Sequence, residues 1–153
     1  MPRTYYEDFV VGEVRTGGPR VITREEIIAF ASEFDPQSMH LDEEAAKKTM
    51  LGGLSASGWH VCALMMRMIA DALVLNSSSM GAPGVDEVKW LKPVRPGDAL
   101  SVRLTVLDKR ESKSRPGVGL IRQRCEMLNQ RGEMVLESSY PGMFGMRPAE
   151  TAQ

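Results

Sequence analysis

Apolar residues in the first third of the chain recur at spacings of three and four, which is the period of a helix. A capping box of Thr23 and Glu26 stands where this pattern starts. Pro36 ends it, because the residue before a proline avoids the helical region. We therefore expect a helix over residues 24–34, with Asp35 at its exit. The apolar positions on the packed face of this helix are Ile27, Phe30, Ala31 and Phe34.

Two further helices are predicted downstream. Residues 42–48 carry acidic side chains first and basic ones last, as the helix dipole prefers, and a pair of glycines ends this segment. From Ser57 to about Leu75 the chain is apolar almost all round, which is typical of a helix buried on most sides. Arg67 and Asp71, four residues apart, interrupt the apolar run and mark its solvent-exposed edge. A core helix therefore explains this run better than a membrane span does.

After the loop that follows the long helix, the period changes to two, the period of half-buried strands. A first strand is also expected over residues 10–15, before a loop at Gly17-Gly18-Pro19. Helices followed by strands predict an α+β fold, in which a curved antiparallel sheet wraps around the long helix. Because an open sheet has exposed edges, pairing with a second copy of the chain would complete it. The later strands are expected at Val88–Trp90 and over residues 100–106, 118–128 and 133–140.

Composition sets the class of protein. The chain has 153 residues, 42% of them apolar, which suits one domain with a hydrophobic core. We expect this domain to span residues 1–147 and residues 148–153 to form a disordered tail. The formal charge of −1 gives no bias toward nucleic acid. Residues 1–10 lack the apolar core of a signal peptide, so a cytoplasmic location is expected.

Charge is unevenly distributed along the chain. Residues 103–124 hold seven Lys or Arg against two Asp or Glu, a local net of +5. A solvated face of the sheet is the simpler explanation, and a surface for the phosphates of a carrier such as coenzyme A is the alternative. Cys62 and Cys125 lack the spacing of a metal or redox pair, so we expect two buried free thiols and no metal site.

The most informative segment runs from Phe34 to Asp42, because it places Asp35 and His40 in one short, turn-rich stretch. A carboxylate and an imidazole held together can share one water molecule and move its protons. Simpler roles stay open at this point. Asp35 can be a turn residue beside a proline, and His40 a loop histidine satisfied by a hydrogen bond such as one to Asp42.

Ser57-Gly58 begins the long helix and is the second candidate. Glycine lets a substrate carbonyl approach helix N–H groups that lack an intrahelical partner, which makes an oxyanion-type site. In the simpler interpretation Ser57 is an N-cap and Gly58 a point of close packing. His60 fits a packed, hydrogen-bonded histidine better than an acid–base role. The three methionines within residues 65–68 are expected to fill the core, with an acyl pocket as the lesser alternative.

Four segments, in this order, resemble the MaoC-like dehydratase family, the (R)-specific enoyl-CoA hydratases of hotdog fold. Tyr6–Glu13 resembles the family's opening, and Asp35–Ala46 is similar to its hydratase motif. Gly52–Gly58 resembles the start of the central hotdog helix, and Lys92–Asp98 resembles a strand–turn signature of the family. The resemblance covers most of the chain, from about residue 5 to 140.

The resemblance implies roles for individual residues. Asp35 and His40 would be the catalytic pair, and the N–H of Gly58 would polarise a thioester carbonyl. The family commonly has Asn-Pro between the pair, where this chain has Gln37-Ser38. It also commonly has His before the helix glycine, where this chain has Ser57, whose hydroxyl would then be offered to the carbonyl.

The function so implied is the reversible addition of water to the double bond of a 2-enoyl thioester, a step of fatty acid metabolism, with neither cofactor nor metal. Coenzyme A or a carrier protein would carry the acyl group as part of the substrate. Two alternatives are an acyl-CoA thioesterase and a non-catalytic module that binds acyl thioesters. The expected partners are this substrate and a second copy of the chain, in a homodimer or a larger homo-oligomer, with no nucleic acid and no membrane.

Overall fold

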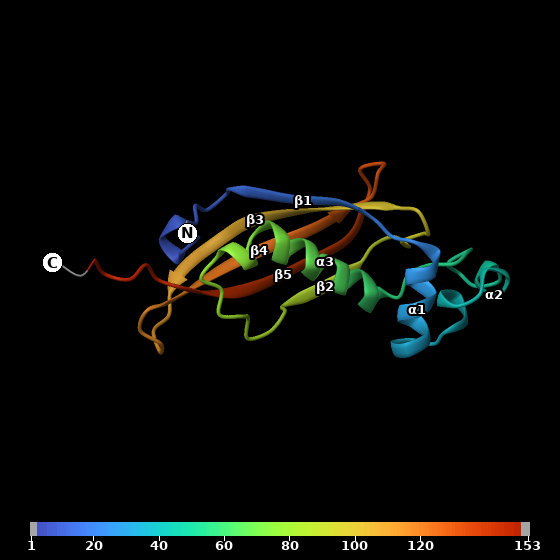
Figure 1. Ribbon diagram of the computed structural model, residues 1–153, viewed down its shortest axis with the longest axis horizontal. Helices are drawn as coiled ribbons and strands as arrows, with labels where there is room; N and C mark the ends of the chain where they lie inside the picture. The colour runs from blue at the N-terminus through green and yellow to red at the C-terminus, as the bar shows by residue number, and fades with distance from the viewer. Residues whose placement is uncertain (1–2, 151–153) are drawn as a thin grey trace.

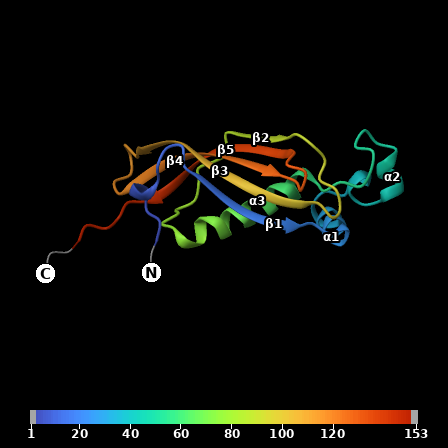
Figure 2. The ribbon, with the colours of Figure 1, turned by 90° about the horizontal axis from the view of Figure 1, so that it is seen from above.

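A computed structural model describes residues 3–150 of the chain. Five strands form one antiparallel sheet with the order β1-β3-β4-β5-β2, and the helix α3 (Gly58–Ala72) lies against one face of it (Figures 1 and 2). The sheet curves around this helix, so the expected α+β hotdog fold is confirmed. The strands are β1 (Val14–Val21), β2 (Glu87–Trp90), β3 (Ala99–Glu111), β4 (Val118–Leu128) and β5 (Met134–Gly145).

The helices α1 (Arg24–Phe34) and α2 (Glu43–Lys47) lie together at one end of the molecule, beside the start of α3 (Figure 1). The N- and C-terminal segments of the described range, residues 3–150, lie toward the opposite end of the sheet (Figure 2). The capping box of Thr23 and Glu26 forms as predicted, with both of its hydrogen bonds present. Three short 3₁₀ turns complete the helical segments: Tyr6–Asp8, Ser38–His40 and Val74–Asn76.

The core lies between α3 and the inner face of the sheet. Alternate residues of β3 point inward, because successive side chains of a strand face opposite sides, and these residues are almost fully buried. Most of the apolar side chains of α3 meet them, although Trp59 and Met66 are exposed. By length and composition Gly58–Asn76 passes for a membrane span, but it supplies this core. Its buried residues include Val61, Leu64, Met65, Met68 and Ile69.

The first strand, expected over residues 10–15, is displaced: β1 begins at Val14 and runs to Val21. A turn occupies residues 10–13, in which the Glu13 N–H donates to the Val10 carbonyl at 3.1 Å and Gly12 has a φ of 90°. Such a positive φ suits glycine and bends the chain before it can pair as a strand. Val10 and Val11 are more than half exposed, so these two apolar residues do not form the packed face of a strand.

The loop predicted at Gly17-Gly18-Pro19 lies inside β1 instead. The pairing of β1 with β3 shifts register between Gly17 and Arg20, which is a bulge in an edge strand. A Cβ on Gly17 would meet the Val102 side chain at 3.1 Å and the Met68 carbonyl at 3.3 Å. Glycine there lets the strand run close to α3, where a side chain would be crowded.

The sequence predictions for the long helix, the cysteines and the C-terminal tail are confirmed in part. The Arg67–Asp71 ion pair forms at 3.0 Å on the exposed side of α3. The helix ends at Ala72 rather than near residue 75, where a 3₁₀ turn follows. Cys125 is buried, whereas Cys62 is only half-buried. Residues 146–150 have no regular secondary structure, and the rest of the predicted tail lies outside the described residues.

In the basic segment over residues 103–124, the arginines of β3 and β4 that alternate with buried residues lie on the outer face of the sheet, away from α3. Three of its arginines form ion pairs there, Arg103 and Arg124 with Glu126, and Arg122 with Asp86. Two carboxylates thus offset part of the charge of these three arginines. This arrangement favours the simpler explanation, a solvated sheet face, over a phosphate-binding surface.

Candidate active site at the start of the central helix

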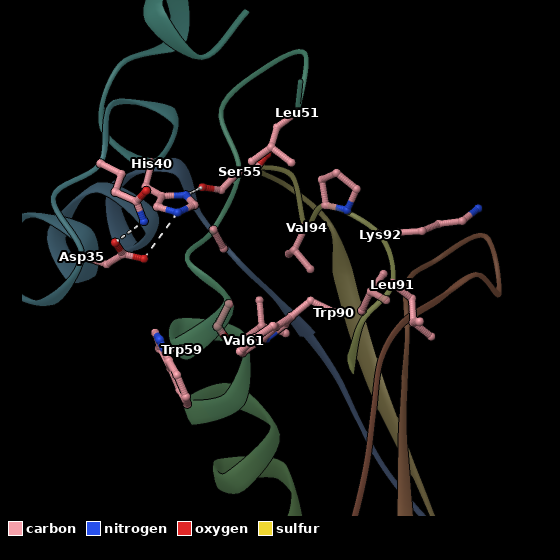
Figure 3. A pocket seen from close by; sticks show the side chains of 15 residues that line it. Asp35, His40, Leu51, Ser55, Trp59, Val61, Trp90, Leu91, Lys92 and Val94 are labelled. Carbon is pink, nitrogen blue, oxygen red and sulfur yellow. Dashed lines mark hydrogen bonds and ion pairs between the residues drawn. The ribbon is translucent and has the colours of Figure 1, made fainter. Parts of the chain in front are cut away.

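Asp35 lies at the C-cap of α1, where its N–H donates to the Ala31 carbonyl at 2.9 Å. Its φ of −151° and ψ of 70° take the chain out of the helix before Pro36. Phe34, expected on the packed face, is 65% exposed, so that prediction is wrong. The end of the helix, without help from Phe34, therefore brings the Asp35 carboxylate to a position where it points toward the start of α3 (Figure 3).

His40 lies in the 3₁₀ turn that follows and is 6% exposed. Its Nδ1 is 2.7 Å from the carbonyl oxygen of Ser55. Because a carbonyl oxygen can only accept, Nδ1 must carry the proton of this hydrogen bond, which leaves Nε2 facing away from Ser55. Asp42, the alternative hydrogen-bond partner of His40, instead caps α2 by accepting from the Ala45 N–H at 2.9 Å.

The two candidate residues meet in space. Oδ2 of Asp35 is 3.4 Å from Nε2 of His40, and both side chains are largely buried. The two carboxylate oxygens also accept hydrogen bonds, Oδ2 from the Ser57 hydroxyl at 2.6 Å and Oδ1 from the Gln37 amide at 2.7 Å. These bonds, that of Ser57 foremost, hold the pKa of the Asp35 carboxyl below its usual range. Asp35 is therefore ionised at neutral pH.

Ser57 occupies the N-cap position of α3, but its side chain forms no capping hydrogen bond. The hydroxyl donates to Asp35 instead. Ser57 is therefore not an ordinary N-cap, and its hydroxyl is already engaged rather than directed at a substrate carbonyl. Gly58 is a point of close packing, because a Cβ there would lie 2.5 Å from the ring of Trp90. Its N–H belongs to the first turn of α3, where backbone donors have no intrahelical acceptor.

A cavity of about 400 Å³ opens beside these residues. Figure 3 shows Asp35 and His40 at one side of it and Trp90, Leu91 and Lys92 at the other. Gly58 lines it as well, so the carboxylate, the imidazole and the helix N-terminus share one space. Met65, Met66 and Met68, for which an acyl pocket was the lesser alternative, do not line this cavity. The apolar side chains around it are Leu51, Ala56, Trp59, Val61, Trp90, Leu91, Pro93, Val94 and Val135.

His60 does not join the candidate pair. Its ring stacks on that of Phe30 at 4.6 Å and 7° and is 7% exposed. The prediction that His60 is packed is confirmed. Its Nδ1, however, has no hydrogen-bond partner within residues 3–150. Burial lowers its pKa, so the ring is neutral at neutral pH.

Two further residues of the site carried little signal in the sequence. Gln37 is one of the two positions at which this chain differs from the family's common Asn-Pro. The difference drew attention to this position but did not predict the hydrogen bond from Gln37 to Asp35. Ser55 contributes a backbone carbonyl, which any residue type would supply. Among residues 3–150, no group of three or more His, Cys, Asp or Glu side chains is arranged to hold a metal ion.

A curved sheet around one helix, with a carboxylate–imidazole pair at the N-terminus of that helix, defines a hotdog protein with a polar site at the helix start. Residues 9–123 match the family model described as the MaoC like domain. The chain therefore belongs to the MaoC-like dehydratase family.

Known proteins similar to this chain support that assignment. The crystal structure of a MaoC-like dehydratase from Rhodospirillum rubrum superposes with a TM-score of 0.87 at 41% identity, covering 94% of this chain and 98% of that one. The uncharacterized protein YdeM of Bacillus subtilis is 29% identical over 86% of this chain and 92% of its own length. Mesaconyl-CoA hydratase of Cereibacter sphaeroides is 28% identical over 97% of this chain, which spans only 42% of that enzyme.

Proposed function

We propose that this protein is a hydro-lyase that adds water reversibly to the double bond of a 2-enoyl thioester, with coenzyme A as the acyl carrier. The observation that carries the proposal is the 3.4 Å approach of Asp35 to His40 in a cavity that also contains the start of α3. Similarity to a mesaconyl-CoA hydratase supports this class of reaction and carrier.

In the proposed reaction the thioester carbonyl oxygen lies against the N–H of Gly58. As water attacks the β-carbon, electrons move through the double bond to this oxygen, which gains negative charge. A helix N-terminus stabilises such a charge through its free N–H groups and its dipole. One donor of this kind contributes about 3 kcal/mol in well-studied enzymes. The apolar walls of the cavity exclude competing water and strengthen the interaction.

Asp35 and His40 are proposed to divide the proton transfers. The ionised carboxylate takes a proton from the attacking water, whose oxygen bonds to the β-carbon. For this step His40 is an imidazolium, with one proton on Nδ1 bonded to Ser55 and a second on Nε2. The ring gives its Nε2 proton to the α-carbon, and the carbonyl reforms. Transfer of the first proton from Asp35 to His40 across their short separation restores the starting state. Because Nδ1 is tied to Ser55, Nε2 stays directed toward this exchange.

The proposal is tested by incubating the purified protein with crotonyl-CoA and with longer 2-enoyl-CoAs. Loss of the enoyl-thioester absorbance is followed while a thiol reagent monitors free coenzyme A. We expect the absorbance to fall with no release of thiol. Thiol release from a saturated acyl-CoA would favour a thioesterase, and tight acyl-CoA binding without turnover would favour a binding module. Either result would overturn the hydratase.

We also propose that the protein acts as a homodimer. Trp59 and Met66 of α3 and Trp90 and Leu91 at the end of β2 are large apolar side chains that are 46–63% exposed. β2 is an edge strand of the sheet, with one side unpaired. Exposed apolar side chains next to an open strand edge are typical of an interface with a second copy.

A further inference from the structure

The turn before β3 contacts the loop that leads into α3 through the side chain of Arg95. Nη1 of Arg95 donates to the Gly53 carbonyl at 2.8 Å and to the Ser55 hydroxyl at 2.9 Å, and Nη2 donates to the Leu51 carbonyl. A longer contact of Nη1 with the Leu54 carbonyl, at 3.5 Å, completes the set. All four acceptors are neutral oxygens of residues 51–55, which we call the approach loop. The guanidinium therefore cross-links one loop to another, using the several fixed donors that only arginine offers.

Ser55 links this cross-link to the candidate catalytic histidine. Its hydroxyl accepts from Arg95, its N–H donates to the Met39 carbonyl at 3.1 Å, and its carbonyl accepts from Nδ1 of His40 at 2.7 Å. Arg95 and His40 thus hold two atoms of the same buried residue. A shift of the approach loop would move the carbonyl that fixes the proton on Nδ1.

Arg95 is itself held in place by Asp98, which is 4% exposed. One carboxylate oxygen of Asp98 accepts from the Arg95 N–H at 2.9 Å and the other from the Gln130 amide at 3.0 Å. Beside it, the Ala56 N–H donates to the Val94 carbonyl at 2.9 Å. The turn is therefore a fixed support, onto which the side chain of Arg95 fastens the approach loop.

The approach loop needs such a fastening because its own sequence is permissive. Residues 48–57 form no helix or strand, and two consecutive glycines, Gly52 and Gly53, lie within them. Gly52 has a φ of 70°, a conformation that glycine adopts without strain and leaves as easily. External hydrogen bonds must therefore select the single arrangement that presents the Ser55 carbonyl to His40.

We propose that Arg95 is a positioning residue for His40. Through Ser55 it keeps the proton of the neutral imidazole on Nδ1 and directs Nε2 at Asp35. This inference rests on the proposed function, in which Nε2 exchanges protons with the substrate. Arg95 does not line the cavity, so its effect on catalysis would pass through the ring that it helps to orient.

The test compares Arg95→Gln and Arg95→Lys with Arg110→Met, a control at an exposed arginine of β3. Each change is made in a His60→Phe background, which leaves His40 as the single histidine. The two ring nitrogens are observed by ¹⁵N NMR at about pH 9, well above the ordinary histidine pKa of about 6.5. Hydration kinetics are measured on the same proteins, and circular dichroism checks that each is folded.

We expect the parent and Arg110→Met to show a proton on Nδ1 alone, and Arg95→Gln to show a mixture of the two tautomers. In Arg95→Gln kcat should fall about 10- to 100-fold while KM changes less than about threefold, since ring geometry rather than binding is altered. Arg95→Lys should lie between, because it keeps a charged donor.

An unchanged tautomer with an unchanged kcat in a folded Arg95→Gln protein would overturn the proposal. If that variant does not fold, Arg95→Lys decides by the same two readouts. A parent without hydratase activity whose ring still changes tautomer on Arg95→Gln would refute the proposed function and leave the positioning role standing. The ¹⁵N measurement therefore tests the positioning role of Arg95 independently of the hydratase activity.

Discussion

At the scale of single residues, the site depends on hydrogen bonds that keep one acid ionised. The Ser57 hydroxyl is the strongest influence that lowers the pKa of Asp35, with Gln37 second. A base of lowered pKa stays ionised to lower pH, and activity is lost only as the pH falls through that pKa. Removing the hydroxyl should therefore move the loss of activity to higher pH.

We predict that Ser57→Ala shifts the acid limb of the kcat/KM profile upward in pH, since the pKa of Asp35 rises toward its usual value. Near pH 8 the rate should change far less, because the carboxylate stays ionised there. Rates measured from about pH 4 to about pH 8 check this. Ser32→Ala, at an exposed serine of α1 whose hydroxyl donates to the Ile28 carbonyl, is the control. An acid limb that stays in place or moves to lower pH would refute the role of Ser57.

His60 gives a second prediction, about stability. Burial lowers its pKa from 6.5, so the folded protein takes up this proton less readily than the unfolded chain does. Below about pH 6.5 the unfolded state therefore binds more protons, and stability falls as the pH falls through the lowered pKa. Glu26, whose charge favours the proton, and Arg20, whose charge opposes it, act on the ring less than burial does.

We expect His60→Phe, which retains the stacking on Phe30, to remove this loss of stability. Urea midpoints measured between about pH 7.5 and about pH 5.5 should decline for the wild-type protein and stay level for the variant. A wild-type midpoint that rises on acidification, or equal declines in both proteins, would contradict the assignment.

The sequence predicted the meeting of Asp35 and His40, because a short loop after a proline keeps the two close. It did not predict the partners that fix them. Ser55 acts through a carbonyl that every residue has, and the bond from Ser57 to Asp35 joins positions 22 residues apart. Such contacts depend on the packing of separate segments, which leaves no periodic signal along the chain.

At the scale of elements, the packing of α3 against the end of β2 shapes the cavity. Gly58 fits under the ring of Trp90, whose Nε1 donates to the Gly58 carbonyl at 2.9 Å. We predict that Gly58→Ala destabilises the protein by about 1–3 kcal/mol, because the added methyl group overlaps the ring. Gly84→Ala is the matched control, since a Cβ there meets nothing within 4 Å.

Urea unfolding of both glycine variants measures the difference. Equal stability for Gly58→Ala and the wild-type protein would show that Trp90 yields without cost and that close packing does not select this glycine. The variant keeps its backbone N–H, so its hydratase activity separately reports whether the position of Trp90 affects substrate binding.

Helices and strands whose ends are marked by capping residues, prolines or turns in the sequence were predicted at the right positions. A strand that depends on pairing with a distant strand was not. The range of α1 follows from its capping box and its proline. β4 covers the range expected for it, residues 118–128. β1 was misplaced because its bulged centre, Gly17-Gly18-Pro19, has the composition of a loop. Its strand character comes from pairing with β3, a long-range contact that local sequence does not encode.

At the scale of the whole molecule, the exposed apolar side chains beside β2 predict self-association. Sedimentation equilibrium at micromolar concentration should give twice the chain mass of 16.9 kDa. Met66→Glu, which places a charge on the exposed side of α3 outside the cavity, should shift the protein toward the monomer. A wild-type protein that stays monomeric throughout would exclude this interface.

The most direct test of the central claim is kcat for the hydration of crotonyl-CoA by wild-type protein, Asp35→Asn and the control Glu33→Gln. Glu33 is an exposed carboxylate of the same helix and does not line the cavity. Loss of the base should lower kcat by about 10²- to 10⁴-fold in Asp35→Asn, with the fold intact, and Glu33→Gln should match the wild type. A folded Asp35→Asn protein that hydrates crotonyl-CoA at the wild-type rate would contradict the account.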